Sequence, residues 1–183
     1  MGYETITDAK LGFEDFQENG SGIAERAYLL PLSWILSEKF PLAALTGKSL
    51  VEITTAHTMK AGKAPIQVTP FFDKSGAASE GIGQMLSRMF KPTAKFFMPQ
   101  ISADNVGTLT ALKNTRFLVL IERSSGGDLI QIGTGKLPAY IMNSPVSLGE
   151  GPEGEVGITL EVGVSASVVP FYFYKAVVPV LGV

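Results

Sequence analysis

The sequence predicts a mainly β protein: an antiparallel β-sandwich or barrel with one flanking α-helix and an extended N-terminal arm. Three observations lead to this prediction. Apolar and polar side chains alternate in several short runs, which is the period of a half-buried strand. Glycine-rich turns separate many of these runs, and only one stretch has both the spacing and the cap of a helix. Packed antiparallel sheets are the architecture that best fits this order of elements.

The chain begins with the predicted arm, residues 1–24, and we expect residues 25–183 to form a single β-rich domain. Before Arg26 the chain holds one basic residue, Lys10, and six acidic ones: Glu4, Asp8, Glu14, Asp15, Glu18 and Glu25. The stretch ENGSG that closes the arm is a loop signal. Because so polar a segment packs poorly into a core, we expect it to become ordered only against a neighbouring molecule.

Extended segments follow the arm. The stretch ERAYLLPLSWIL is apolar and is predicted to be extended across Pro31. In SLVEITTAHTM, Val51, Ile53 and Thr55 alternate with polar neighbours, which predicts a strand. The stretch APIQVTPFFD is predicted to continue as strand after a turn or flexible loop at KAGKA.

The middle of the chain contains the predicted helix. For EGIGQMLSRMFKPTAKFFMPQ two interpretations stay open, a short helix around residues 85–90 or a long twisted strand. In SADNVGTLTALKN, Ser102 is a suitable N-cap and Asp104 lies in the first turn. Apolar residues then recur every three positions, at Val106, Leu109 and Leu112, so we expect a helix here.

The last third of the chain is predicted to be β. RFLVLIER is expected to be a buried strand, SSGGD its hairpin loop, and LIQIG the returning strand. Further strands are predicted in LPAYIMNS, EVGITLEVG and PFYFYKAVV. The total is about seven or eight strands.

The stretch SLGEGPEGEVGITLEVG places Gly149, Gly151 and Gly154 at the spacing of a dinucleotide-binding fingerprint. That fingerprint requires a helix after the glycines, whose N-terminus meets the pyrophosphate. Here the next residues alternate as a strand does, and Pro152 has no N–H to offer a phosphate. Three carboxylates would also lie close to the phosphate: Glu150, Glu153 and Glu155. We therefore predict an acidic glycine turn that precedes a strand.

The composition narrows the possible chemistry. With no cysteine and one histidine, the chain has no disulfide, no thiolate chemistry and no multi-histidine metal site. Fifteen basic and 17 acidic residues leave a net charge of −2, which is not the basic footprint of a nucleic-acid binder. The sequence TGKS resembles the end of a P-loop, but Leu42 stands where the first glycine is required. We expect no catalytic residue, no cofactor and no metal.

The remaining candidates have ordinary structural explanations. His57 lies in a strand-like segment with no nucleophile motif nearby, so we expect a structural role. Glu153 and Glu155 are expected to be solvated rather than an acid–base pair. The many aromatic residues are expected in the core or at a subunit interface, because no basic groove accompanies them.

The order of elements resembles that of the bacteriophage major tail tube proteins. The resemblance rests on the acidic arm, the segment GIAERAYLLPLSWI, the hairpin NTRFLVLIERSSGGDLIQIGTG and the closing GEGPEGEVGITLEVGVSASVVPFYFY. The closing segment looks like the last hairpin of tube subunits, in which an acidic glycine-rich turn leads into a strand and then an aromatic strand. The match is clearest over residues 114–178, and no motif in it is as specific as a metal signature.

The resemblance implies a structural virion protein without catalytic activity. Subunits of this family form rings, usually of six, that stack into a tube conducting DNA from capsid to host. This chain would be made in the host cytoplasm, reside in the phage tail, contact other tail proteins, and let DNA pass without tight binding or membrane insertion. We expect a modestly acidic bore. The residues expected at subunit contacts or facing the bore are Glu14, Asp15, Glu18, Glu150, Glu153, Glu155, Phe171 and Phe173.

Two other interpretations stay open from the sequence. One is a different phage component on the same kind of scaffold, such as a capsid decoration or tail terminator protein. The other is a ligand-binding β-sandwich, for instance for carbohydrate, that uses Trp34 or Tyr172.

Overall fold

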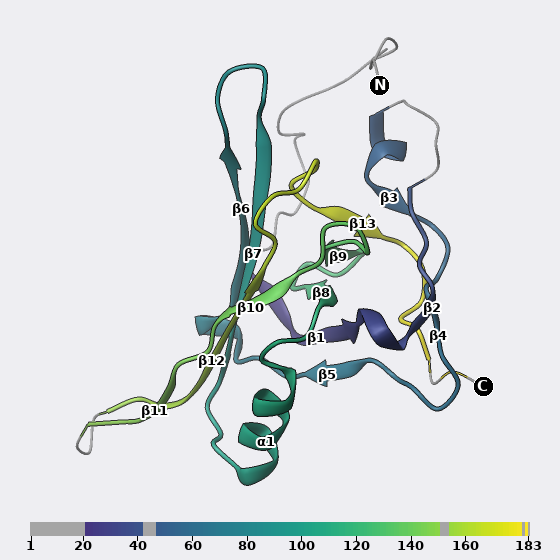
Figure 1. Ribbon diagram of the computed structural model, residues 1–183. Helices are drawn as coiled ribbons and strands as arrows, with labels where there is room; N and C mark the ends of the chain where they lie inside the picture. Colours follow the sequence, from purple (N-terminus) through teal and green to yellow (C-terminus); the bar gives the residue numbers. More distant parts are fainter. Residues whose placement is uncertain (1–20, 42–46, 151–153, 181, 183) are drawn as a thin grey trace.

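The computed structural model describes residues 21–41, 47–150, 154–180 and 182, and it consists of packed β-sheets with one α-helix in that part of the chain (Figure 1). Its strands are β1 (Ile23–Pro31), β2 (Ile35–Ser37), β3 (Glu52–Ile53), β4 (Thr58–Met59), β5 (Ile66–Val68), β6 (Gly76–Ile82), β7 (Met89–Met98), β8 (Phe117–Arg123), β9 (Leu129–Ile132), β10 (Tyr140–Asn143), β11 (Val146–Leu148), β12 (Val156–Gly163) and β13 (Tyr172–Tyr174). Its helices are α1 (Ala103–Leu112) and the 3₁₀ turns η1 (Leu32–Trp34), η2 (Gly47–Leu50) and η3 (Phe72–Lys74).

The strands form two main sheets. The larger sheet has six strands in the order β3-β13-β9-β8-β1-β5, and the smaller has four in the order β10-β12-β7-β6, with β11 also paired to β12. Strands β2 and β4 form a separate two-stranded sheet. Every pairing is antiparallel except that of β13 with β3. The predicted fold class, mainly β and antiparallel with one α-helix, is confirmed.

Strand β8 lies inside the larger sheet and is buried on both faces. Phe117, Val119 and Ile121 belong to one apolar cluster, and Leu118 and Leu120 belong to a second. A strand covered on both sides needs apolar residues at every position, which explains the uninterrupted run FLVLI. The predicted hairpin of β8 with β9 is confirmed, and its register places Val119 opposite Ile132.

The two apolar clusters lie on opposite faces of the larger sheet. The first fills the space between the two main sheets, where Phe96, Leu160 and Val162 come from the smaller sheet. The second contains Met59 of β4 and Tyr174 of β13, with side chains of β2 packed against it. The small β2–β4 sheet therefore covers the face of the larger sheet that the smaller sheet leaves open.

Helix α1 forms where the cap predicts it. The Ser102 hydroxyl oxygen accepts a hydrogen bond from the Asn105 backbone N–H at 3.2 Å. Leu109 and Leu112 pack against the first cluster, but no residue of the helix is fully buried. The helix therefore flanks the sandwich and is not part of its core.

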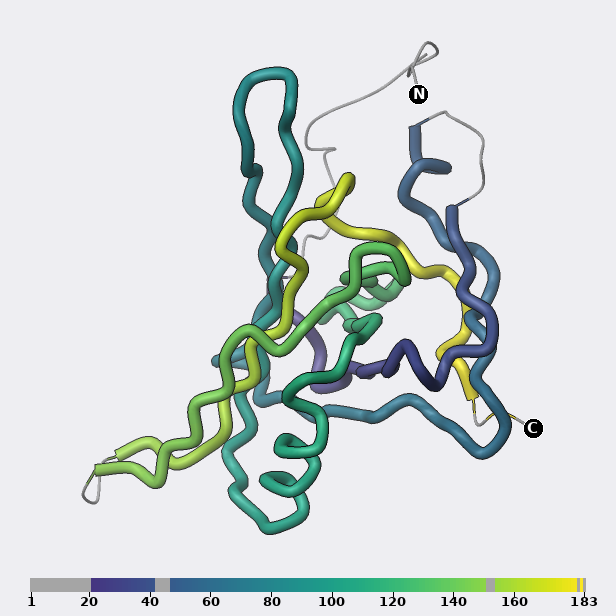
Figure 2. The backbone as a smooth tube through the Cα atoms, in the orientation of Figure 1, coloured from purple at the N-terminus to yellow at the C-terminus, as the bar shows by residue number. Residues whose placement is uncertain are grey.

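Two hairpins extend from the body in different directions (Figure 2). One is β6–β7, paired from Gly76 opposite Lys95 to Ile82 opposite Met89. The stretch EGIGQMLSRMFKPTAKFFMPQ, for which a short helix or a long twisted strand was predicted, forms neither. The chain reverses direction at Gly83, whose φ is +93°. The other hairpin is β11–β12, and residues 151–153 of the predicted acidic glycine turn lie outside the described part of the chain.

Several predicted strands are shorter than expected. The stretch SLVEITTAHTM was predicted as one strand, but it forms two short ones, β3 and β4, because the chain bends between them to bury His57. In APIQVTPFFD the strand β5 ends at Val68 and η3 follows. At the other end of the domain, β1 begins at Ile23, within the last two residues of the predicted arm, while residues 1–20 lie outside the described part.

Candidate assembly surfaces

His57 has a structural environment. Its Nδ1 accepts a hydrogen bond from the Lys39 backbone N–H at 3.0 Å, so the ring proton lies on Nε2, which donates to Gln131 Oε1 at 2.8 Å. Burial lowers the pKa of His57, which keeps the imidazole neutral. Because both ring nitrogens are engaged inside the protein, His57 is not available as a general base in this conformation.

The same network joins distant parts of the chain. The His57 backbone N–H donates to the Tyr174 hydroxyl at 2.9 Å, and that hydroxyl donates to the Val177 carbonyl at 3.3 Å. The Gln131 amide donates to the Gly133 carbonyl at 3.0 Å. The segment before β4, strand β9 and the chain after β13 are therefore held by one buried polar cluster.

The described residues contain no group of three or more His, Asp or Glu side chains that could hold a metal ion. Within the same part of the chain, no helix is long and apolar enough to cross a membrane.

The two aromatic residues considered for ligand binding are partly buried. Trp34 and Tyr172 pack against the second apolar cluster. The Lys63 ammonium also lies 5.0 Å from the centre of the Trp34 ring, over its face. Both side chains therefore contribute to packing within the subunit.

The acidic residues predicted at contacts fall into two groups. Glu150 and Glu155 are both exposed on the β11–β12 hairpin, where Glu155 forms an ion pair with Lys74. The Glu155 carbonyl also accepts a hydrogen bond from the Ser147 hydroxyl at 3.0 Å, which ties the two strands near their turn. The other predicted acidic residues lie outside the described residues: Glu14, Asp15, Glu18 and Glu153.

Phe171 and Phe173 are both partly buried. Phe171 packs against the first cluster, and Phe173 lies in β13 between Ile130 of β9 and Glu52 of β3. They lie away from the β11–β12 turn, so the structure does not bring the predicted aromatic and acidic residues into one site (Figure 1).

The smaller sheet ends in a strand edge on each side, β6 and β10. Ser79 of β6 stands directly opposite Pro92 of β7. The Pro92 carbonyl accepts a hydrogen bond from the Val164 backbone N–H, so the Pro92 carbonyl points away from β6. Opposite residues of an antiparallel pair point their backbone groups either toward each other or both away. The N–H and C=O of Ser79 therefore point outward from the sheet edge.

The outer face of the smaller sheet carries opposed charges. Lys91 of β7 stands opposite Glu80 of β6, and Lys95 stands opposite Glu161 of β12. Side chains at such positions are neighbours about 5 Å apart at Cβ. A shallow groove of about 680 Å³ runs along this face and is lined in part by Lys91, Lys95 and Glu161. The charges of these four residues cancel.

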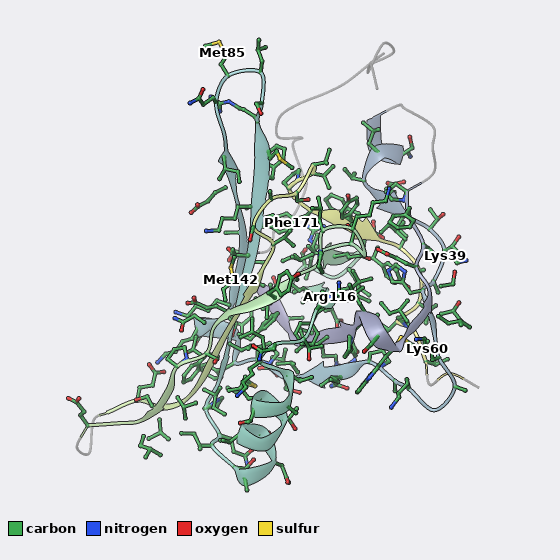
Figure 3. The ribbon with its side chains drawn as sticks, viewed as in Figure 1. Lys39, Lys60, Met85, Arg116, Met142 and Phe171 are labelled. Atoms are coloured by element: carbon green, nitrogen blue, oxygen red, sulfur yellow. The ribbon has the colours of Figure 1, made fainter. Side chains whose placement is uncertain are left out.

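The tip of the β6–β7 hairpin is apolar and exposed, with Met85 projecting from its end (Figure 3). Sequence reasoning missed this surface and the two sheet edges. A signal for the tip was present, because GIGQMLSR places glycines and a serine around two apolar residues, as turns do.

No protein-family model, curated protein or solved structure matches this chain.

Proposed function

We propose that this chain is a structural virion protein that assembles into stacked rings, six subunits to a ring by the resemblance, and so forms the phage tail tube through which DNA is ejected. The observation that carries the proposal is the smaller sheet, which has a strand edge on each side and an outer face with balanced charge.

The two edges suit a ring. Joining β6 of one copy to β10 of the next is a contact between different surfaces, and such contacts close into a ring when the rotation between copies allows it. Exposed strand edges favour aggregation of a monomer, whereas in a polymer they are joints. Strand β6 carries the short side chains Ala77, Ala78 and Ser79, so a neighbouring backbone can approach it closely.

The balanced outer face suits the wall of a bore. Affinity for DNA grows with each phosphate that a lysine or arginine neutralises. Here each lysine of the face has a glutamate as its cross-strand neighbour, so little positive charge is left for a phosphate. The sequence led us to expect an acidic bore. If this face lines the bore, the charges of Lys91, Lys95, Glu80 and Glu161 make the lining neutral instead.

Electron microscopy of the purified protein and two edge variants tests the proposal. We expect rings or tubes for the unaltered chain and for Ser79→Ala, which keeps the backbone N–H. Ser79→Pro removes an N–H that points away from β7, so we expect a folded subunit, judged by circular dichroism, that no longer forms rings. An unaltered chain that stays monomeric at high concentration would contradict the proposal.

A further inference from the structure

Leu86, at the tip of the β6–β7 hairpin, combines full exposure with backbone strain. Its relative exposure is 101% and that of Met85 is 85%. Its φ is +66°, the sole positive value among non-glycine residues in the described part of the chain. Glycine or asparagine adopts this conformation more easily than a branched side chain. Among the described residues, no packing contact accounts for a leucine here, and strained backbone positions cluster at functional sites such as ligand clamps.

An apolar groove of about 510 Å³ lies beneath helix α1. Its floor includes Met98, Leu112 and Ile158, and its polar rim includes Gln100, Asn105 and Thr108. Because α1 contributes no fully buried residue, the helix leaves this groove open. The volume lies within the range of about 300–1,000 Å³ typical of pockets that enclose a ligand, so it can receive side chains of the size of Met and Leu.

The tip and the groove lie at opposite ends of the subunit. Strand β7 starts beside the tip at Met89 and ends at the groove with Met98, and Figure 1 shows the hairpin tip and α1 at the upper and lower ends. A surface that fits another surface at the far end of the same molecule produces a repeating head-to-tail contact. Resting on the proposed function, we infer that Met85 and Leu86 of one subunit dock into the α1 groove of a subunit in the next ring.

Charge selects this tip over the other candidates. Arg88 is the charged residue of the turn 83–88, and Asp104 lies in the first turn of α1, next to Asn105 on the groove rim. The β11–β12 hairpin carries Glu150 and Glu153 in its connecting sequence, in addition to Glu155, which is paired with Lys74, and the arm is also acidic. Both of these would bring negative charge toward Asp104, whereas the β6–β7 tip brings a positive charge.

The joint also implies a spacing between rings. Leu86 and Met98 are twelve residues apart along a nearly continuous strand. At about 3.3 Å per residue, the tip and the groove are separated by roughly 40 Å. The axial repeat of rings joined in this way should therefore be no longer than about that distance, and it should be shorter if β7 is tilted from the tube axis.

Cysteine crosslinking tests the contact, because the chain has no cysteine of its own. We would assemble a mixture of Leu86→Cys and Thr108→Cys subunits, one of them carrying a mass tag, and then oxidise it. A disulfide requires Cα atoms about 4.4–6.8 Å apart, so we expect a mixed dimer on a non-reducing gel. The control is Leu148→Cys mixed with Thr108→Cys, which places a thiol at another exposed position, on the other hairpin, and should give no mixed dimer.

The outcomes separate the joint from the proposed function. Rings or tubes that form without the tip–groove crosslink would overturn the contact between the tip and the groove but would leave the proposed function standing. Crosslinks from Leu148→Cys alone would have the same meaning. Absence of both particles and crosslinks would overturn both.

A second variant does not depend on crosslinking. Leu86→Asn relieves the backbone strain and removes the apolar side chain, so the subunit should be at least as stable as the unaltered chain. Loss of the buried leucine should nevertheless raise the concentration needed for tube growth by about tenfold or more. Tubes of normal length at the normal concentration would overturn the joint.

Discussion

The two main sheets differ in what covers them. The six-stranded sheet is packed on both faces, by the smaller sheet on one side and by the β2–β4 sheet on the other. The four-stranded sheet packs its inner face against the larger sheet. Its outer face carries Lys91 and Lys95 and is covered at one end, where Phe97 lies beside Lys74 of η3, and two of its hairpins extend beyond the core. The larger sheet therefore buries side chains on both of its faces, whereas the smaller sheet leaves part of its outer face and two hairpins for contacts with other molecules.

The largest expected effect is on stability, from the same truncation in each sheet. Leu120→Ala in β8 removes a fully buried side chain and should lower the free energy of unfolding by about 2–5 kcal/mol. Leu148→Ala in β11 removes a side chain that is 78% exposed and should change the free energy of unfolding by less than about 0.5 kcal/mol. Urea unfolding of both variants measures the difference. Equal losses would contradict the division between the sheets.

A smaller effect, dependent on pH, is expected from the polar cluster on the covered side of the larger sheet. Since burial lowers the pKa of His57 below 6.5, the unfolded chain takes up the proton first. The stability that the neutral ring contributes is present above about pH 6.5 and is lost as the pH falls below it. Protonation also places a hydrogen on His57 Nδ1, which then can no longer accept the hydrogen bond from the Lys39 backbone N–H.

The comparison with His57→Gln isolates this contribution. Burial raises the pKa of Glu38 above 4.5, so Glu38 makes the opposite contribution, a loss of stability as the pH rises. Both proteins keep Glu38, and the difference between their unfolding free energies therefore reports on His57. That difference should shrink as the pH falls from 7.5 toward 5 (about the window set by the imidazole). A difference that does not depend on pH would show that the ring is not held neutral.

The smallest effect concerns the exposed face of the smaller sheet and leaves folding unchanged. Replacing Glu80 and Glu161 by Gln leaves Lys91 and Lys95 without opposed carboxylates. Assembled particles of this variant should bind duplex DNA, with an affinity that falls as salt rises. Fluorescence anisotropy should detect no such binding by the unaltered particles at physiological salt. A control that removes one carboxylate away from this face, Glu150→Gln on the hairpin, should behave like the unaltered chain.

The parts of the fold that could be predicted depend on local sequence. The cap at Ser102, the buried run of β8 and the alternating run of β12 are each specified by a few adjacent residues. The break between β3 and β4 could not be predicted, because the alternation of Val51, Ile53 and Thr55 resembles a continuous strand. The chain bends there to reach Gln131, a residue 74 positions away.

The surfaces proposed for assembly could not be predicted from the sequence for a similar reason. Whether β6 or β10 is an edge depends on the order of strands in the sheet, which no short stretch of sequence encodes. The pairing of Lys95 with Glu161 depends on the register of β7 against β12. The acidic residues at Glu150 and Glu155 were found because they are clustered in the sequence.

A three-dimensional reconstruction of the assembled particle by electron microscopy, at a resolution that traces strands, would show whether the smaller sheet forms the ring contacts and the wall of the bore. We expect β6 of each subunit to run beside β10 of its neighbour and the face carrying Lys91 and Lys95 to line the bore. A particle in which the smaller sheet faces outward, or in which β6 and β10 of neighbouring subunits lie apart, would contradict this expectation.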